Sequence, residues 1–133
     1  MKRKMLTFLM TAAVTGLFFL PAGAQTTYHD YDSLVKELRK LEDDYSDLAE
    51  LSSIGKTGQK RDVWLLRLTN EKNANVAEKP AFFFCATLEA DRLIGGESLL
   101  YTARKLLQGY EEDEQVRALL DNNTCYVVPR VNP

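Results

Sequence analysis

The feature that most constrains the fold is an unbroken apolar run at residues 81–86, Ala-Phe-Phe-Phe-Cys-Ala. A short continuous run of this kind, rich in aromatic residues, is typical of a central strand covered on both faces. A second strand-like run, residues 124–130, follows after a long helical stretch. Because a helical crossover joins parallel strands, we expect the two runs to lie parallel. The sequence therefore predicts an α/β sheet with the Phe-rich strand at its centre.

The segment before this strand predicts a helix followed by a β-hairpin. Apolar residues recur at helical spacing from Tyr31 to about residue 43, with Asp30 or Asp32 available as the N-cap. Residues 49–56 and 62–69 are strand-like stretches joined by a short polar turn that contains glycine. These elements would add an antiparallel pair of strands to the sheet.

Two further helices are predicted between the Phe-rich strand and the last strand. The first covers residues 93–108 and stops at Gly109, and the second covers residues 113–120 and begins with acidic side chains that suit its positive end. We expect Trp64 and the aromatic residues 82–84 to lie in the core. The predicted fold class is α/β, a partial mixed sheet with helices on both faces.

The first 24 residues have the layout of a secretory signal. Three basic residues precede an apolar run at residues 5–20, and the small residues 22–24 form a cleavage site. A membrane anchor is the alternative, but the run is shorter than the roughly 20 residues that a spanning helix needs, and Pro21 ends it. We expect cleavage after Ala24 and a secreted or periplasmic protein.

The mature chain, residues 25–133, is mildly acidic. Removing the signal takes away three basic residues and no acidic ones, so the net charge changes from −2 to −5. Without a basic cluster, we expect neither nucleic acid nor an anionic membrane as a partner. Cys85 and Cys125 could form a disulfide in an oxidising compartment, but each lies in an apolar run, which favours two buried free thiols.

Several segments resemble the zinc carboxypeptidases of the carboxypeptidase A type. Residues 28–32, Tyr-His-Asp-Tyr-Asp, are similar to the opening motif, and residues 53–57 and 61–64 are similar to the first hairpin. Residues 126–133, Tyr-Val-Val-Pro-Arg-Val-Asn-Pro, resemble a strand that continues with Asp-Gly in relatives. The resemblance covers residues 28–133. It implies the N-terminal portion of a zinc-carboxypeptidase-like domain of the phosphorylase/hydrolase type, truncated after its last strand.

The resemblance also places the family's zinc motif in this chain. Relatives carry His-x-x-Glu, two of three zinc ligands, followed by Gly-x-Glu at the start of a helix. Aligning on Gly95, Gly96 and Glu97 places Glu89 at the His position and Arg92 at the Glu position. The third ligand, the substrate-binding Arg and the general-base Glu of the family are expected beyond residue 133. Zinc is thus the implied family cofactor, and we expect neither zinc nor catalytic residues in this chain.

The residue types lead to the same expectation without the family. Catalytic zinc needs three protein ligands, and the single histidine, His29, lies beside the mature N-terminus, where a surface or capping role is expected. Carboxylates at Glu89, Asp91 and Glu97 suit calcium or magnesium better, and Arg92 opposes any cation. Glu97 is expected to charge the start of its helix.

Glu89, Asp91 and Arg92 are expected to form a salt-bridged turn at the carboxyl end of a strand, where α/β sheets usually bind ligands. A remodelled binding cleft and drift at an unused site are equally compatible with this turn. Two main functions follow. One is a secreted metallocarboxypeptidase that removes C-terminal residues from peptides, with this part inactive by itself. The other is a pseudo-peptidase that binds peptide or glycan ends without cleaving them. A truncated product that folds poorly is a third possibility.

Overall fold

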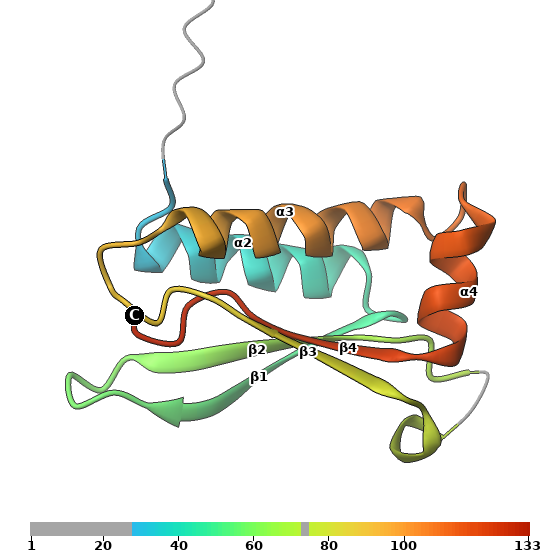
Figure 1. Ribbon diagram of the computed structural model, residues 1–133, viewed down its shortest axis with the longest axis horizontal. Helices are drawn as coiled ribbons and strands as arrows, with labels where there is room; N and C mark the ends of the chain where they lie inside the picture. Colours follow the sequence, from blue (N-terminus) through green and yellow to red (C-terminus); the bar gives the residue numbers. More distant parts are fainter. Residues whose placement is uncertain (1–27, 73–74) are drawn as a thin grey trace, which may run out of the picture.

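The computed structural model describes residues 28–72 and 75–133 of the chain (Figure 1). The secretory signal predicted at residues 1–24 lies outside the described residues. Within the described part, no helix is both long enough and apolar enough to cross a membrane.

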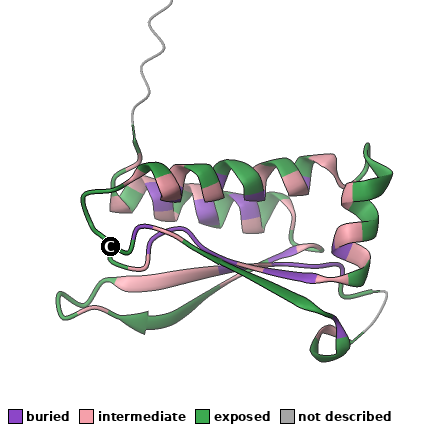
Figure 2. Cartoon of the chain, viewed as in Figure 1, coloured by how far each residue is buried: buried purple, intermediate pink, exposed green. Residues whose placement is uncertain are grey.

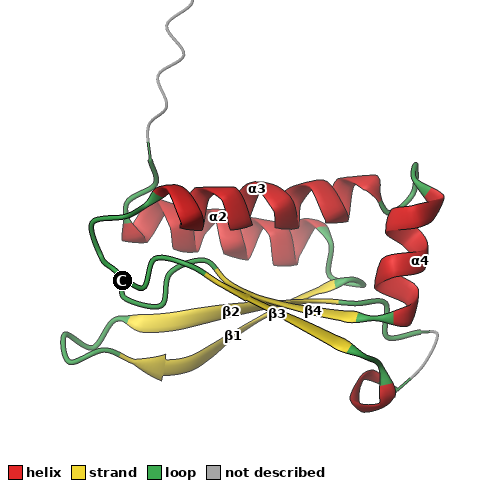
Figure 3. Cartoon of the chain, viewed as in Figure 1, coloured by secondary structure: helices red, strands yellow, loops and turns green. Residues whose placement is uncertain are grey.

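The described chain forms a four-stranded mixed sheet packed against helices (Figure 3). The strand order is β1-β2-β4-β3; β2 pairs antiparallel with β1 and β4, whereas β3 and β4 are parallel. The predicted mixed α/β class and the parallel pairing across the helical crossover are therefore confirmed. The elements in chain order are α2 (Tyr31–Asp44), β1 (Ala49–Lys56), β2 (Asp62–Leu68), η1 (Val76–Glu78), β3 (Ala81–Cys85), α3 (Ile94–Gly109), α4 (Glu114–Asn122) and β4 (Thr124–Val128).

Local side-chain contacts fix the starts of α2 and α4 within one residue of the predicted positions. Asp30 is the N-cap of α2, and its Oδ1 accepts a 2.8 Å hydrogen bond from the backbone N–H of Ser33. Asp113 caps α4 in the same way, accepting from the backbone N–H of Gln115 at 2.8 Å. In both cases a carboxylate satisfies a free donor in the first turn of a helix.

The core lies on one face of the sheet. Leu38 of α2, Leu107 of α3 and Leu120 of α4 belong to one buried cluster with Leu66 of β2 and Val127 of β4. Figures 1 and 2 show α2 and α3 on the same side of the strands, with their buried residues turned toward the sheet. The sequence predicts helices on both faces, whereas α2 and α3 of the described residues cover the same face (Figure 1).

Strand β3 is an edge strand of the described sheet and does not lie at its centre. Phe82, Phe83 and Phe84 are 46%, 60% and 42% exposed, and the rings of Phe82 and Phe84 stack with centroids 6.3 Å apart. The predicted central position and core role of residues 82–84 are therefore wrong for this structure, whereas Trp64 packs partly buried against the core. The apolar pattern predicts a strand whose side chains are buried by neighbouring elements, but it does not predict which elements bury them. An unpaired apolar edge is a typical place for another strand to add.

The two cysteines are free and lie in different environments. In the β3–β4 register, Cys125 is opposite Phe82 and Cys85 is opposite Val128, so the thiols are offset by three positions along neighbouring strands. Cys125 is buried, and burial raises the pKa of its thiol. Cys85 is exposed on the edge strand. The prediction of two buried free thiols is correct for Cys125 and wrong for Cys85.

A polar network joins the end of β2 to α3 and α4. The side-chain amide of Asn70 donates to Asp121 at 2.7 Å and to the Tyr110 hydroxyl at 2.8 Å, and that hydroxyl donates to Asp121 at 2.7 Å. These hydrogen bonds, that of Asn70 first and that of Tyr110 second, lower the pKa of the Asp121 carboxyl. The same contact with Asp121 raises the pKa of Tyr110.

The Asp121 network is expected to make stability depend on pH in acid. The pKa of the Asp121 carboxyl in the folded chain lies below the unfolded value of about 3.9. The free energy that this carboxylate adds to folding is therefore fully present above the unfolded pKa, and it is lost as pH falls through the folded pKa. Asp121→Asn should lower Tm at pH 7 and reduce the further fall in Tm on acidification. Circular dichroism melts at several pH values measure both effects, with the exposed Asp43→Asn as the control. Equal acid sensitivity of Asp121→Asn and the parent chain would contradict this account.

Candidate functional site

The loops that follow β3 and β4 lie side by side at the carboxyl ends of two parallel strands. Val131 and Asn132 donate backbone hydrogen bonds, each 3.1 Å long, to the carbonyl oxygens of Ala86 and Thr87. This pairing extends the contact between the strands into the loops. Residues 89–92 therefore lie at the sheet edge where α/β proteins usually bind ligands.

The first turn of α3 packs closely against both loops at Gly96. A Cβ atom at this position would lie 2.7 Å from the carbonyl oxygen of Pro129 and 2.9 Å from the hydroxyl oxygen of Thr87. Thr87 has a φ of 52°, in the left-handed region that non-glycine residues rarely adopt, and its buried hydroxyl has no hydrogen-bond partner among the described residues. Because Gly96 has no side chain, the first turn of α3 can pack directly against Thr87 and Pro129, and this contact fixes the position of the loop at residues 86–93.

Glu89 and Arg92 form the ion pair that the sequence suggested. Arg92 Nε lies 2.5 Å from Glu89 Oε2, and the backbone N–H of Arg92 donates to the Glu89 carbonyl oxygen at 3.0 Å. Both side chains are mostly exposed, so the pair itself stabilises the turn little. Asp91 is also exposed and forms no ion pair with a described residue.

The donor set at this turn does not fit a catalytic zinc ion. Zinc is bound by thiolate, imidazole or carboxylate ligands, usually three of them in a catalytic site. Here the Arg92 guanidinium, a cation without an acceptor, lies against the carboxylate of Glu89. Residues 28–72 and 75–133 contain no cluster of three or more His, Cys, Asp or Glu side chains that could hold a metal.

His29 and Glu97 form a contact that the sequence reasoning missed. His29 Nδ1 lies 2.8 Å from Glu97 Oε2, and the His29 backbone N–H donates to Glu97 Oε1 at 2.8 Å. Arg130 Nη2 donates to the His29 carbonyl oxygen, also at 2.8 Å. His29 is thus half-buried between α3 and the loop after β4, not a simple surface or capping residue. The partners are 68 and 101 residues apart, so no local pattern signals the contact.

A hollow of about 640 Å³ lies beside these contacts. It combines the segment that leads into α2, the β1–β2 turn and the two loops at the carboxyl ends of β3 and β4. Two arginines, Arg61 and Arg130, contribute to its wall. The full set of lining residues is His29, Asp30, Tyr31, Thr57, Gly58, Gln59, Arg61, Ala90, Leu93, Arg130, Asn132 and Pro133.

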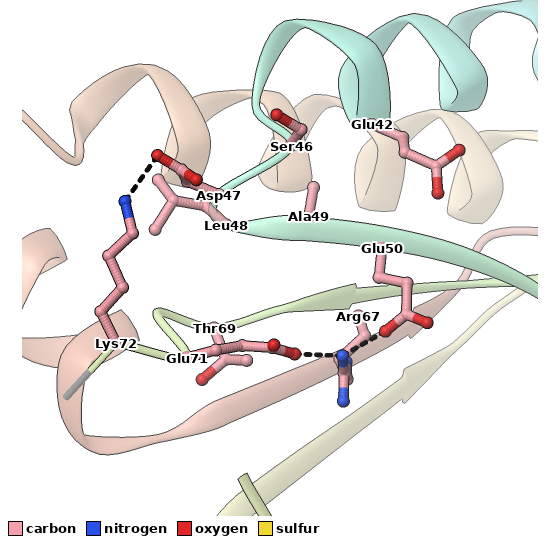
Figure 4. Close-up of a pocket in the computed structure, with 10 residues that line it drawn as sticks. All are labelled: Glu42, Ser46, Asp47, Leu48, Ala49, Glu50, Arg67, Thr69, Glu71 and Lys72. Atoms are coloured by element: carbon pink, nitrogen blue, oxygen red, sulfur yellow. Dashed lines mark hydrogen bonds and ion pairs between the residues drawn. The ribbon is translucent and has the colours of Figure 1, made fainter. Parts of the chain in front are cut away.

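A second hollow, of about 530 Å³, lies where β1 begins and β2 ends (Figure 4). Its charged side chains are paired with one another: Lys72 Nζ lies 2.7 Å from Asp47 Oδ2, and Arg67 binds both Glu50 and Glu71. Both cations of the lining are therefore engaged, and with Glu42 the carboxylates outnumber them four to two, so this hollow does not suit an anionic ligand. The hollow beside Arg130 is therefore the better candidate site.

Comparison with known proteins gives the family. The zinc carboxypeptidase family model matches residues 34–133. A zinc carboxypeptidase from Saccharothrix mutabilis subsp. capreolus is 31% identical over 113 residues, 85% of this chain and 26% of the relative. Human carboxypeptidase D is 31% identical over 106 residues, 80% of this chain and 8% of the relative.

Solved structures show the same fold. The thrombin-activatable fibrinolysis inhibitor matches with a TM-score of 0.72 at 20% identity, over 80% of this chain and 26% of that chain. Carboxypeptidase A from Helicoverpa armigera matches with a TM-score of 0.67 at 22% identity, over 80% of this chain and 25% of that chain.

The chain belongs to the zinc carboxypeptidase family, a family of hydrolases whose cofactor is zinc. It spans about a quarter of the Saccharothrix relative and a smaller share of carboxypeptidase D. The resemblance stated from the motifs at residues 28–32 and 126–133 is confirmed at the level of the family.

Proposed function

We propose that this chain is an exported carboxypeptidase-like module that binds peptide or glycan ends and has no zinc-dependent peptidase activity of its own. The supporting observation is the Glu89–Arg92 ion pair at the two positions that correspond to zinc ligands in relatives. A guanidinium there repels a divalent cation, and it also pairs with the carboxylate at the other of these two positions. Export rests on the secretory signal proposed at residues 1–24.

The second candidate function is zinc-dependent removal of C-terminal residues from peptides, which family membership favours. It would require ligands for zinc that come from outside the described residues, with Glu89 released from Arg92. The two functions therefore differ in one measurable property, the affinity of the chain for zinc.

Zinc content tests the proposal directly. The purified chain, dialysed against zinc and then against buffer, is expected to retain far less than one zinc per chain and to release no amino acid from peptides with free C-termini. The double variant Glu89→His, Arg92→Glu restores the His-x-x-Glu pattern and removes the cation, so it should hold zinc more tightly than the parent chain. Elemental analysis and competition with a coloured chelator measure both.

A matched control makes the same net charge change of −1 at exposed residues away from the turn. Glu78→His with Lys105→Glu also adds one histidine and one glutamate, and it should leave zinc retention at the parent level. One bound zinc per parent chain, together with peptide turnover, would contradict the proposal. Equal zinc retention by the restored double variant and the parent chain would show that the ion pair is not what excludes the metal.

A further inference from the structure

Arg130 is a buried cation with few hydrogen-bond partners. Its side chain is 9% exposed, and its Nη2 donates to the His29 carbonyl oxygen at 2.8 Å. Its Nε is buried and has no partner among residues 28–72 and 75–133. A guanidinium has five N–H donors, and buried donors without partners are rare in native proteins because they lose their hydration. A buried arginine at the wall of a hollow therefore points to an anionic ligand.

Arg61 brings a second positive charge to the same hollow. It lies in the β1–β2 turn, and its guanidinium lies over the Tyr31 ring, 5.4 Å from the centroid. Stacking of this kind holds a planar guanidinium in place while its edge N–H groups stay free to bind an oxyanion. Two arginines from segments 69 residues apart in the sequence thus line one hollow.

The remaining charges limit the charge of the ligand. Asp30 also lines the hollow, but its carboxylate is engaged by the N–H and hydroxyl of Ser33, the contacts that chiefly lower its pKa. The imidazole of His29 faces the Glu97 carboxylate. Counted over side chains, the two arginines exceed the lining acid by a single positive charge, which suits a monoanion better than a dianion.

We propose that the hollow beside Arg130 is a binding site for a small organic monocarboxylate. The carboxylate would lie between the Arg130 and Arg61 guanidinium groups, which match its planar geometry. Its apolar body would rest on the side chains of Tyr31, Leu93 and Pro133, which line the same hollow. The volume of about 640 Å³ is in the usual range for small-molecule sites. This site does not depend on whether the turn at residues 89–92 binds zinc.

Benzoate titrated into the purified chain tests the site. Isothermal calorimetry gives the affinity, and amide shifts in ¹H–¹⁵N spectra locate the binding. Benzamide, which has the same ring without the charge, should bind at least about tenfold more weakly, since it lacks the charge-assisted hydrogen bonds. Inorganic phosphate should also bind more weakly than benzoate. The largest amide shifts are expected near Asp30, Arg61 and Arg130.

Substitutions of exposed residues distinguish binding at this site from a general effect of the charge of the chain. Arg61→Gln should weaken benzoate binding about tenfold, whereas Arg117→Gln should not change it. Arg117 is the matched control because it is also exposed and stacks over a tyrosine, Tyr110, at 6.0 Å. Asp30→Asn keeps an N-cap for α2 and removes the competing carboxylate, so it should strengthen benzoate binding by about twofold or more.

Each result decides the proposal. Weaker binding to Arg61→Gln together with tighter binding to Asp30→Asn supports it. Equal binding of benzoate and benzamide, or equal effects of Arg61→Gln and Arg117→Gln, overturns it. Tighter binding of phosphate than of benzoate overturns the assignment to a monocarboxylate. Because Arg130→Gln could unfold the chain by removing the bond to His29, the decision rests on the exposed residues Arg61 and Asp30.

Discussion

Replacing Gly96 with alanine is expected to lower the free energy of unfolding by about 3 kcal/mol, the cost of overpacking at a site that cannot relax. The new Cβ would lie 2.7 Å from the Pro129 carbonyl oxygen, a backbone atom that the β4 loop holds in place, and 2.9 Å from the Thr87 hydroxyl. The clash outweighs the gain of roughly 1 kcal/mol that alanine brings over glycine within a helix. Urea unfolding followed by tryptophan fluorescence measures the change.

The same substitution at the other end of α3 provides the control. A Cβ at Gly109 would meet a methyl group of Val116 at 3.4 Å, which is ordinary van der Waals contact. Gly109→Ala should therefore keep or raise stability through helix propensity. If Gly96→Ala were as stable as the parent chain, α3 could not approach the Thr87 and Pro129 loops as closely as the structure shows, and the position of the turn at residues 89–92 would change with it.

The elements that the sequence predicted correctly depend on residues close together in the chain. Asp30 caps the helix three residues before Ser33, and the apolar spacing that buries Leu34, Leu38 and Leu41 is a property of one helix. The ion pair of Glu89 and Arg92 is also local, since the two residues are three apart. Such features can be inferred from one sequence because few alternative partners compete for them.

The features that the sequence did not predict depend on distant partners. The Phe-rich run of β3 predicts a strand that requires cover, but its edge position follows from which strands pair, and no residue within the run determines that. His29 meets Glu97 and Arg130 only because α3 begins, and β4 ends, beside the segment that leads into α2. The hollow lined by Arg61 and Arg130 likewise exists only once the hairpin and the β4 loop are in place.

Replacing Leu66 with alanine should show how differently the two faces of the sheet contribute to the free energy of unfolding. Leu66 is fully buried on the helix-covered face, between its cross-strand neighbours Leu51 and Val127. Its truncation removes transfer free energy and leaves a cavity, so we expect a loss of about 3–4 kcal/mol. The adjacent Leu65 points to the opposite, half-buried face, and Leu65→Ala should cost about 1 kcal/mol.

The comparison of Leu66→Ala with Leu65→Ala also tests what covers the bare face of the sheet in solution. Both variants lose the same atoms from neighbouring positions of β2, so strand propensity and sequence context largely cancel in the difference. A difference of about 2 kcal/mol or more in urea unfolding is expected if the helices alone form the core, as the single buried cluster indicates. Equal losses would mean that Leu65 is buried as deeply as Leu66, which requires a second layer over the face opposite the helices, the face on which the strand registers also place Phe83. The exposed aromatic edge would then be part of an interface rather than a surface in water.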